Sequence, residues 1–181
     1  MDKTKGLLLA SGIILLTTTA TFLLLIPDYD SNIYKIQSDI NELNEQIYTR
    51  QLNINLCSDQ LVKISSTRGT YEILKELNSS QQNDWENHLR AQYIMLIKMV
   101  AQENTDIDYL STLSIEELEE RAESEVKLSN EEYNKLVHDK NTLDETLNLE
   151  IEKRNKLNRD TAIVQLFGLF LGILGSSLKK S

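Results

Sequence analysis

The chain has 181 residues, with one proline and six glycines, so few positions would interrupt a helix. Its formal net charge is −9, but the charges are unevenly distributed. Four of the 19 basic residues and one of the 28 acidic residues lie at the two ends, which leaves 15 basic and 27 acidic residues in the middle. The acidic residues between the two ends would repel a phosphate backbone, and this excludes nucleic-acid binding in that part of the chain. The composition predicts a mostly helical protein.

The sequence shows no pattern of residues that would carry chemistry. Cys57 is the single cysteine, and it falls at a predicted core position, where an inert thiol is expected rather than a nucleophile. His88 and His138 lie 50 residues apart without a metal-ligand spacing around them. There is no glycine-rich phosphate loop. We therefore predict no catalytic residue, no metal site and no cofactor.

Residues 6–26 form the first of two long apolar segments, with 21 uncharged residues. As a helix this segment is about 31 Å long, close to the hydrocarbon thickness of a bilayer. The alternative is a cleaved signal peptide, because residues 1–5 form a basic flank. The apolar run is too long for such a peptide and no clear cleavage site follows it. We predict an uncleaved transmembrane helix.

Residues 161–178 form the second apolar segment, which is about 27 Å long as a helix and is followed by a basic flank at residues 179–181. Gly168, Gly172 and Gly175 fall at spacings of four and three, so they share one helix face. A face of glycines lets another membrane helix approach closely. We predict that these three form a helix-packing interface, with the first segment or with a second copy. The alternative is that they are tolerated without a role.

The orientation in the membrane follows from basic residues that give conflicting counts. Lys3 and Lys5 outnumber Lys35 around the first segment, which places the N-terminus in the cytoplasm. Around the second segment, the four basic residues within 153–159 outnumber the two at the C-terminus, which indicates the opposite. The first helix usually dominates, and long connecting segments weigh less. We predict a two-pass membrane protein with both termini cytoplasmic and the middle on the opposite side.

Residues 28–65 carry the strongest pattern in the chain. Apolar residues recur at alternating spacings of three and four from Ile33 to Ile64, which is a heptad repeat. Asp30 or Ser31 is expected to cap the start of this helix. An apolar seam of this length needs a partner helix, so the pattern predicts one half of a coiled-coil stalk.

Residues 129–160 supply the predicted second half. Ser129 and Glu132 form a capping box, and charged residues interrupt the seam that follows. Because each stalk helix adjoins a membrane segment, the two must run antiparallel.

The register of the stalk follows if its membrane-proximal ends are paired, Ile33 with Asp160. Arg50, the one charge in the first seam, then lies opposite Leu143. Asp144 and Glu145 are its expected ion-pair partners.

Residues 66–128 are predicted to form a helical head. Gly69 and the hydroxyl residues around it favour a turn. Asn83 is expected to start a helix whose apolar face is buried, and Ser114 with Glu117 forms a second capping box. Asn78 lies in a glycosylation sequon in a predicted loop, a three-residue pattern that is frequent by chance.

Two groups of head residues are candidates for a partner surface. The aromatic and methionine cluster is either helical core or a binding groove, and the acidic stretch 103–125 is either a solvated face or a docking surface for a basic partner or weakly held Ca²⁺. The candidate residues are Trp85, Tyr93, Met95, Met99, Glu116, Glu119, Glu120 and Glu123.

The sequence as a whole predicts an all-α protein in which two terminal transmembrane helices are joined by an antiparallel coiled-coil stalk with a small helical head. Its expected function is that of a non-enzymatic tether, scaffold or accessory subunit, with the lipid bilayer and either a protein partner or a second copy as partners. The alternative is a ligand sensor, because the layout resembles the sensory half of bacterial chemoreceptors and sensor kinases. With no output domain following, such a sensor would signal through a separate partner. An enzyme would need polar residues converging from separate helices.

Overall fold

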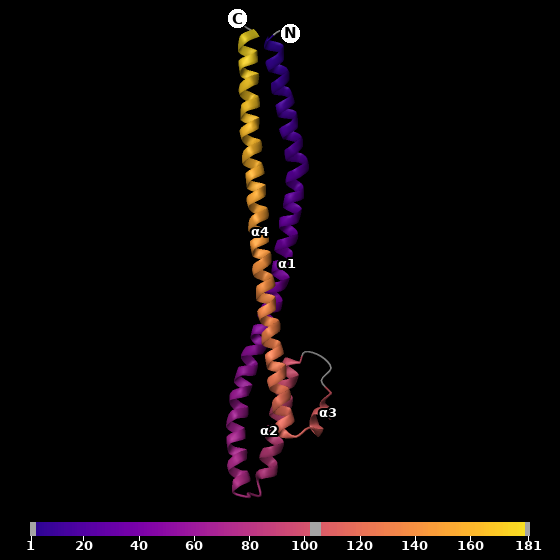
Figure 1. The fold of residues 1–181 in the computed structure, drawn as a ribbon, viewed down its shortest axis with the longest axis vertical. Coiled ribbons are helices and arrows are strands. Elements are labelled where there is room, and N and C mark those ends of the chain that lie inside the picture. The colour runs from indigo at the N-terminus through magenta and orange to yellow at the C-terminus, as the bar shows by residue number, and fades with distance from the viewer. Residues whose placement is uncertain (1–2, 102–105, 180–181) are drawn as a thin grey trace. The chain divides into compact units, whose positions relative to one another are not determined.

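The computed structural model describes residues 3–101 and 106–179. These residues form four helices and no strand: α1 (Lys3–Glu76), α2 (Gln82–Val100), α3 (Ile107–Thr112) and α4 (Ile115–Lys179) (Figure 1). The prediction of an all-α protein is therefore confirmed. Residues 1–2 and 180–181 of the predicted basic flanks, and residues 103–105 of the acidic stretch, lie outside the described residues.

The helix α1 is continuous over 74 residues, so two interruptions predicted from the sequence are wrong. The helix continues through Pro27, and neither Asp30 nor Ser31 caps a helix start. It also continues past Gly69, where an added Cβ would meet no atom within 4 Å. Residues on both sides of Gly69, including Ile64 and Tyr71, are buried. Packing of a continuous apolar face therefore outweighs the local preference for a turn.

The helix α4 is continuous over 65 residues, and its start was predicted in two places. The capping box at Ser114 is confirmed, because its hydroxyl accepts from the Glu117 N–H at 3.1 Å and the Glu117 carboxylate accepts from the Ser114 N–H at 2.7 Å. The capping box at Ser129 is wrong, because Ser129 is a buried residue inside the helix.

The turn between α1 and α2 has an asparagine at its centre. Asn78 adopts the left-handed conformation, with φ of 48°, and the Ser79 N–H donates to the Leu74 carbonyl at 3.0 Å. The Asn78 N–H donates to the Lys75 carbonyl at 3.2 Å. These two bonds form a Schellman motif, which satisfies carbonyls that the helix end would otherwise leave unpaired. Asn78 therefore lies in a loop, as predicted.

The chain divides into two compact units. The terminal unit contains residues 1–41 and 141–181, and the central unit contains residues 42–140. Both α1 and α4 contribute to each unit.

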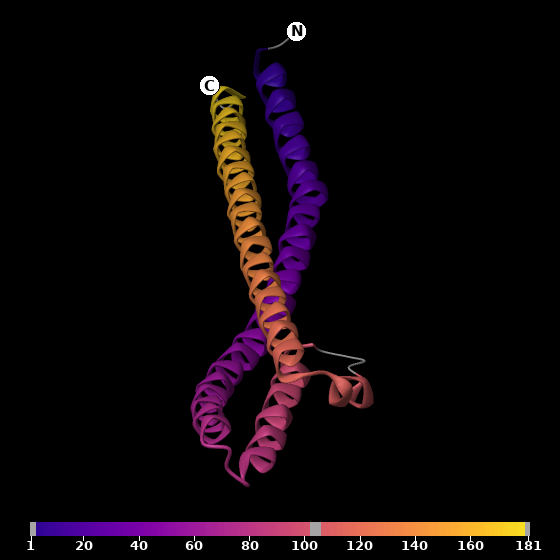
Figure 2. The ribbon, with the colours of Figure 1, turned by 60° about the horizontal axis from the view of Figure 1, so that its bottom comes forward.

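In the terminal unit, the first part of α1 and the last part of α4 run antiparallel and side by side (Figures 1 and 2). Their register is given by three contacts: Gly175 faces Leu7 and Leu8, Gly168 faces Ile14, and Arg154 pairs with Asp30 at 2.6 Å. The two residue numbers of each pair add up to between 182 and 184. The register that paired Ile33 with Asp160 is therefore wrong by about ten residues, or nearly three helical turns.

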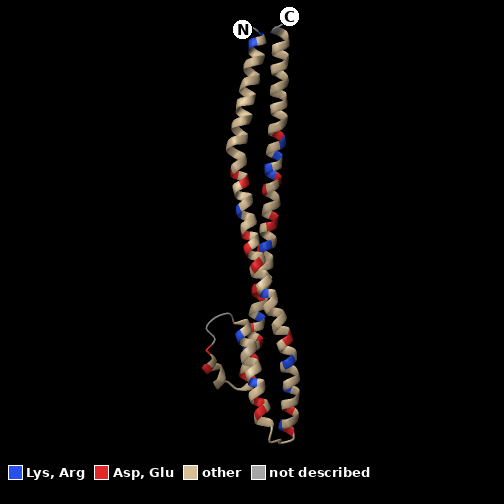
Figure 3. Ribbon diagram, turned by 180° about the vertical axis from the view of Figure 1, so that it is seen from behind, with Lys and Arg blue, Asp and Glu red and all other residues tan. Residues whose placement is uncertain are grey.

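The apolar segments of the terminal unit expose most of their large side chains, although Ile26 is buried, and they bury several small or polar ones. The buried residues include Ser11, Thr18, Thr161, Gly168 and Gly175. The exposed residues are Leu8, Leu9, Ile13, Leu16, Phe22, Leu23, Leu24, Leu25, Ile163, Val164, Leu166, Phe167, Leu169, Phe170, Ile173, Leu174 and Leu178. Figure 3 shows that neither segment carries an acidic or basic residue.

By length and composition alone, α1 and α4 are each apolar enough to cross a membrane. Only 17% of the most apolar stretch of each helix is buried. A core helix of a soluble protein would instead be buried over most of such a stretch.

The central unit differs in having an apolar core between α1, α2 and α4, and its surface carries both charged and apolar side chains. Leu89, Leu96, Ile97 and Leu118 are fully buried, and α3 contributes Leu110. The predicted face of α2 is confirmed at Leu89, Tyr93, Leu96 and Val100, whereas Trp85 is only partly buried.

Candidate functional sites

The three glycines of α4 face α1 inside the terminal unit. A Cβ added to Gly168 would lie 2.7 Å from Ile14 Cγ2, and one added to Gly172 would lie 2.8 Å from Ser11 Oγ. A Cβ added to Gly175 would lie 3.2 Å from Leu7 and Leu8 side-chain atoms. A Cβ at Gly168 or Gly172 would force a neighbouring α1 side chain to shift, and one at Gly175 would be in tight contact with Leu7 and Leu8.

A buried polar contact accompanies the glycines. The Ser11 hydroxyl donates to the Gly168 carbonyl at 2.8 Å, between residues 157 positions apart. In contrast, the hydroxyls of Thr17, Thr18 and Thr21 donate to carbonyls of their own helix. Glycines at 168 and 172 let the helices approach closely enough for Ser11 to reach across, and hydrogen bonds of this kind fix helix register in an apolar environment.

Arg50 of the central unit pairs with Glu132, and not with Asp144 or Glu145 as the sequence analysis predicted. Its side chain is 14% exposed, while that of Glu132 is 57% exposed. The predicted partners lie about three turns further along α4, so the error again comes from the assumed axial shift of one helix against the other.

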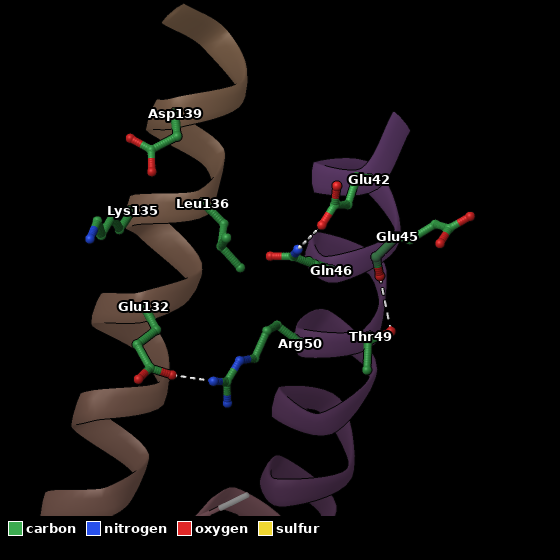
Figure 4. Close-up of a pocket in the computed structure, with 9 residues that line it drawn as sticks. All are labelled: Glu42, Glu45, Gln46, Thr49, Arg50, Glu132, Lys135, Leu136 and Asp139. Carbon is green, nitrogen blue, oxygen red and sulfur yellow. Dashed lines mark hydrogen bonds and ion pairs between the residues drawn. The ribbon is translucent and has the colours of Figure 1, made fainter. Parts of the chain in front are cut away.

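An open groove of about 700 Å³ lies beside this ion pair, between α1 and α4 of the central unit. Figure 4 shows Arg50 reaching from α1 toward Glu132 on α4, with Gln46 and Leu136 above them. The Gln46 amide donates to Glu42 at 3.3 Å, and the Thr49 hydroxyl donates to the Glu45 carbonyl at 2.9 Å. Several polar groups of the groove are therefore already bonded within α1, and a hydrated gap explains the groove adequately.

Tyr93 and Glu119, which the sequence analysis placed in different candidate surfaces, lie together with Arg68. Arg68 pairs with Glu119. Tyr93 is 3% exposed, and burial, followed by the nearby Glu119 charge, raises the pKa of its hydroxyl. The three residues come from α1, α2 and α4, so they form a polar contact within the bundle that no sequence spacing could have indicated.

The remaining candidate residues do not form one surface. Met95 is 54% exposed, and with Met99 it borders a shallow hollow between α2 and α3. Trp85 makes an edge-to-face contact with His88, with ring centroids 6.1 Å apart. Glu116, Glu120 and Glu123 are exposed on α4. A partner surface at these residues stays a prediction.

Cys57 is 4% exposed, and burial raises the pKa of its thiol. No group of three or more His, Cys, Asp or Glu side chains that could hold a metal ion occurs within residues 3–101 and 106–179. Comparison of the chain with protein-family models, with curated proteins and with solved structures gave no match.

Proposed function

We propose that the chain is a non-enzymatic integral membrane protein that crosses the bilayer twice, at residues 6–26 and 161–178. Residues 28–160 lie on one side of the membrane and form an antiparallel coiled coil with a helical head. In this role the protein is a tether, scaffold or accessory subunit of a membrane complex. Both termini lie in the cytoplasm.

The observation that carries the proposal is the inverted polarity of the two apolar segments. Seventeen large apolar side chains are exposed there, whereas Ser11, Thr18 and Thr161 are buried. In water this arrangement would be unstable, because exposing apolar surface costs about 25 cal/mol per Å². In a bilayer it is the expected arrangement, because lipid chains solvate the apolar exterior while small and polar residues pack between the helices.

The charges next to the membrane segments support the proposed orientation. Near the inner end of the second segment, Arg154 pairs with Asp30 at 2.6 Å and Lys153 pairs with Glu150 at 2.6 Å. Lys3 and Lys5 have only Asp2 as an acidic neighbour in the sequence. Lys3 and Lys5 therefore favour a cytoplasmic N-terminus, because the first helix usually dominates the orientation.

Topology labelling tests the proposal. In a Cys57→Ser background, Ser80→Cys labels the central unit and Ser181→Cys labels the C-terminus. A membrane-impermeant thiol reagent applied to intact cells should modify position 80 and leave position 181 unmodified until the membrane is permeabilised. Both variants should remain in the membrane pellet after alkaline extraction.

Other outcomes have distinct meanings. Modification of position 181 alone would reverse the orientation and leave the two-pass arrangement intact. Release of the protein by alkaline extraction would contradict the membrane assignment itself.

A further inference from the structure

A small cavity of about 170 Å³ lies between α1, α2 and α4 of the central unit. Its walls are mainly apolar, and they come from all three helices. The lining residues are Ile54, Cys57, Ser58, Leu61, Val100, Val126, Ser129 and Asn130. None of them carries a formal charge. Apolar cavities of about 150 Å³ hold a benzene-sized molecule.

One of the buried wall residues is polar. Ser129 is 5% exposed, and its hydroxyl makes no hydrogen bond among the described residues. Many other helical hydroxyls in the chain donate to a carbonyl three or four residues earlier, as Thr67 does to Lys63 at 2.9 Å. The Ser129 hydroxyl is therefore available to a ligand in the cavity, which can bond to it in place of water.

The chemistry of the walls restricts the ligand further. Burial raises the pKa of the Cys57 thiol, so the thiol stays protonated and neutral at physiological pH. An ionised ligand would lose its hydration in this cavity without gaining an opposite charge. Ser58 and Asn130 are exposed and mark the side from which a ligand can enter.

We propose that this cavity binds a small uncharged molecule, of the size of a single six-membered ring, that carries one hydroxyl group. The ring fills the space between Ile54, Val100 and Val126, and the hydroxyl bonds to Ser129. Binding of this kind favours the ligand-sensing alternative for the central unit, but it does not depend on the membrane topology.

Cys57 provides the readout, because it is the single cysteine of the chain and lies in the cavity wall. The full chain is reconstituted in phosphatidylcholine vesicles, and Cys57 is modified by a small uncharged thiol reagent. Phenol and toluene are the two probes, since they have similar size and differ in the hydroxyl group. Phenol should slow the modification saturably, by about tenfold at ten times its Kd. Toluene at the same concentration should slow it less.

Three variants separate a specific site from general partitioning. Ser129→Ala should abolish the advantage of phenol over toluene, and Val126→Phe should fill the cavity and abolish protection by both. Leu128→Phe is the matched control, because Leu128 is 50% exposed and does not line the cavity. In this control variant, each probe should protect Cys57 as well as it does in the wild-type protein. Fluorescence of Trp85 reports whether each variant is folded.

The proposal is overturned if neither probe slows the reaction of Cys57 with the thiol reagent in the wild-type protein. It is also overturned if protection persists in a folded Val126→Phe variant. An unchanged preference for phenol in Ser129→Ala would likewise contradict it, and this variant alters too little volume to prevent folding.

Discussion

The two units of the chain use opposite packing. In the central unit, Leu89, Leu96 and Leu118 are fully buried, and the outside carries charged side chains together with exposed apolar ones such as Val62. In the terminal unit, Ser11 and Thr18 are buried and leucines cover the outside. The same two helices, α1 and α4, contribute to both units. Secondary structure therefore does not distinguish the two environments, whereas the polarity of the inner face does.

Under the proposed membrane arrangement, different forces hold the two units together. Burial of apolar surface from water stabilises the central unit. In a bilayer that force is absent between helices, because lipid is as apolar as leucine. Close contact at glycines and the bond from Ser11 to Gly168 must then supply the association in the terminal unit.

Among the predicted effects, the largest difference between the two units should come from replacing a leucine by alanine and measuring the free energy of unfolding. Leu118→Ala removes a fully buried side chain from the central core, and it should lower the free energy of unfolding by about 2–5 kcal/mol. Leu169→Ala removes a side chain that is 51% exposed in the terminal unit, and it should leave the unfolding of the central unit unchanged. Urea unfolding of the full chain in lipid nanodiscs, followed by Trp85 fluorescence, measures both. Equal destabilisation would mean that the two units unfold as one.

A lysine placed on each exterior should distinguish lipid from water as the solvent. Leu16 lies at the centre of the first apolar segment and is 73% exposed, and Val62 in the central unit is 69% exposed. Leu16→Lys should disfavour membrane insertion by about 3 kcal/mol, roughly a hundredfold in the insertion equilibrium. Val62→Lys should change stability by less than about 0.5 kcal/mol. Normal insertion of the Leu16→Lys variant would indicate that this face does not contact lipid.

The sequence predicted which residues face inward better than which residues face each other. The heptad pattern correctly indicated that Ile40, Cys57 and Ile64 are buried, because the spacing alone determines a helix face. The register was wrong because it depends on the axial shift between helices. That shift is determined by individual contacts, such as Gly168 against Ile14, which neither helix shows by itself.

Local signals at helix ends had mixed success for a similar reason. Ser114 and Ser129 each begin a capping-box sequence, and only Ser114 caps a helix. Leu118 and Ala122, which lie between the two serines, are buried in the core. The helix has therefore already formed before Ser129, and Ser129 lies inside it. The contact of Tyr93, Glu119 and Arg68 could not be predicted, because it requires three separate helices to meet.

Enlarging a glycine should have different effects on the inner face and on the outer face of the terminal unit. Gly172→Leu would place side-chain atoms against Ser11 and should weaken helix association by about 1–3 kcal/mol. Gly12→Leu is the matched control in the partner segment, since a Cβ there meets no atom within 4 Å. Disulfide cross-linking between cysteines at positions 30 and 154, in a Cys57→Ser background, measures the association without changing the glycine face. Equal yields in the two variants would contradict the packing.

Removal of the Ser114 cap should have the smallest effect, and that effect should depend on pH. Ser114→Ala should destabilise the central unit by about 1 kcal/mol at neutral pH, whereas Ser124→Ala, at an exposed mid-helix position, should not.

The pH dependence comes from Glu117. The hydrogen bond from the Ser114 N–H has the largest effect in lowering the pKa of the Glu117 carboxyl, and the bond with the Ser114 side chain lowers this pKa further. A lowered pKa in the folded state means that the ionised carboxylate stabilises the fold above its unfolded pKa of about 4.3, and that this contribution is lost as the pH falls through the folded value. Glu117→Gln should therefore match the unmodified protein in acid and be less stable at neutral pH. Residues 6–26 and 161–178 contain no ionisable side chain, so the association of these two segments should not change over the same pH range.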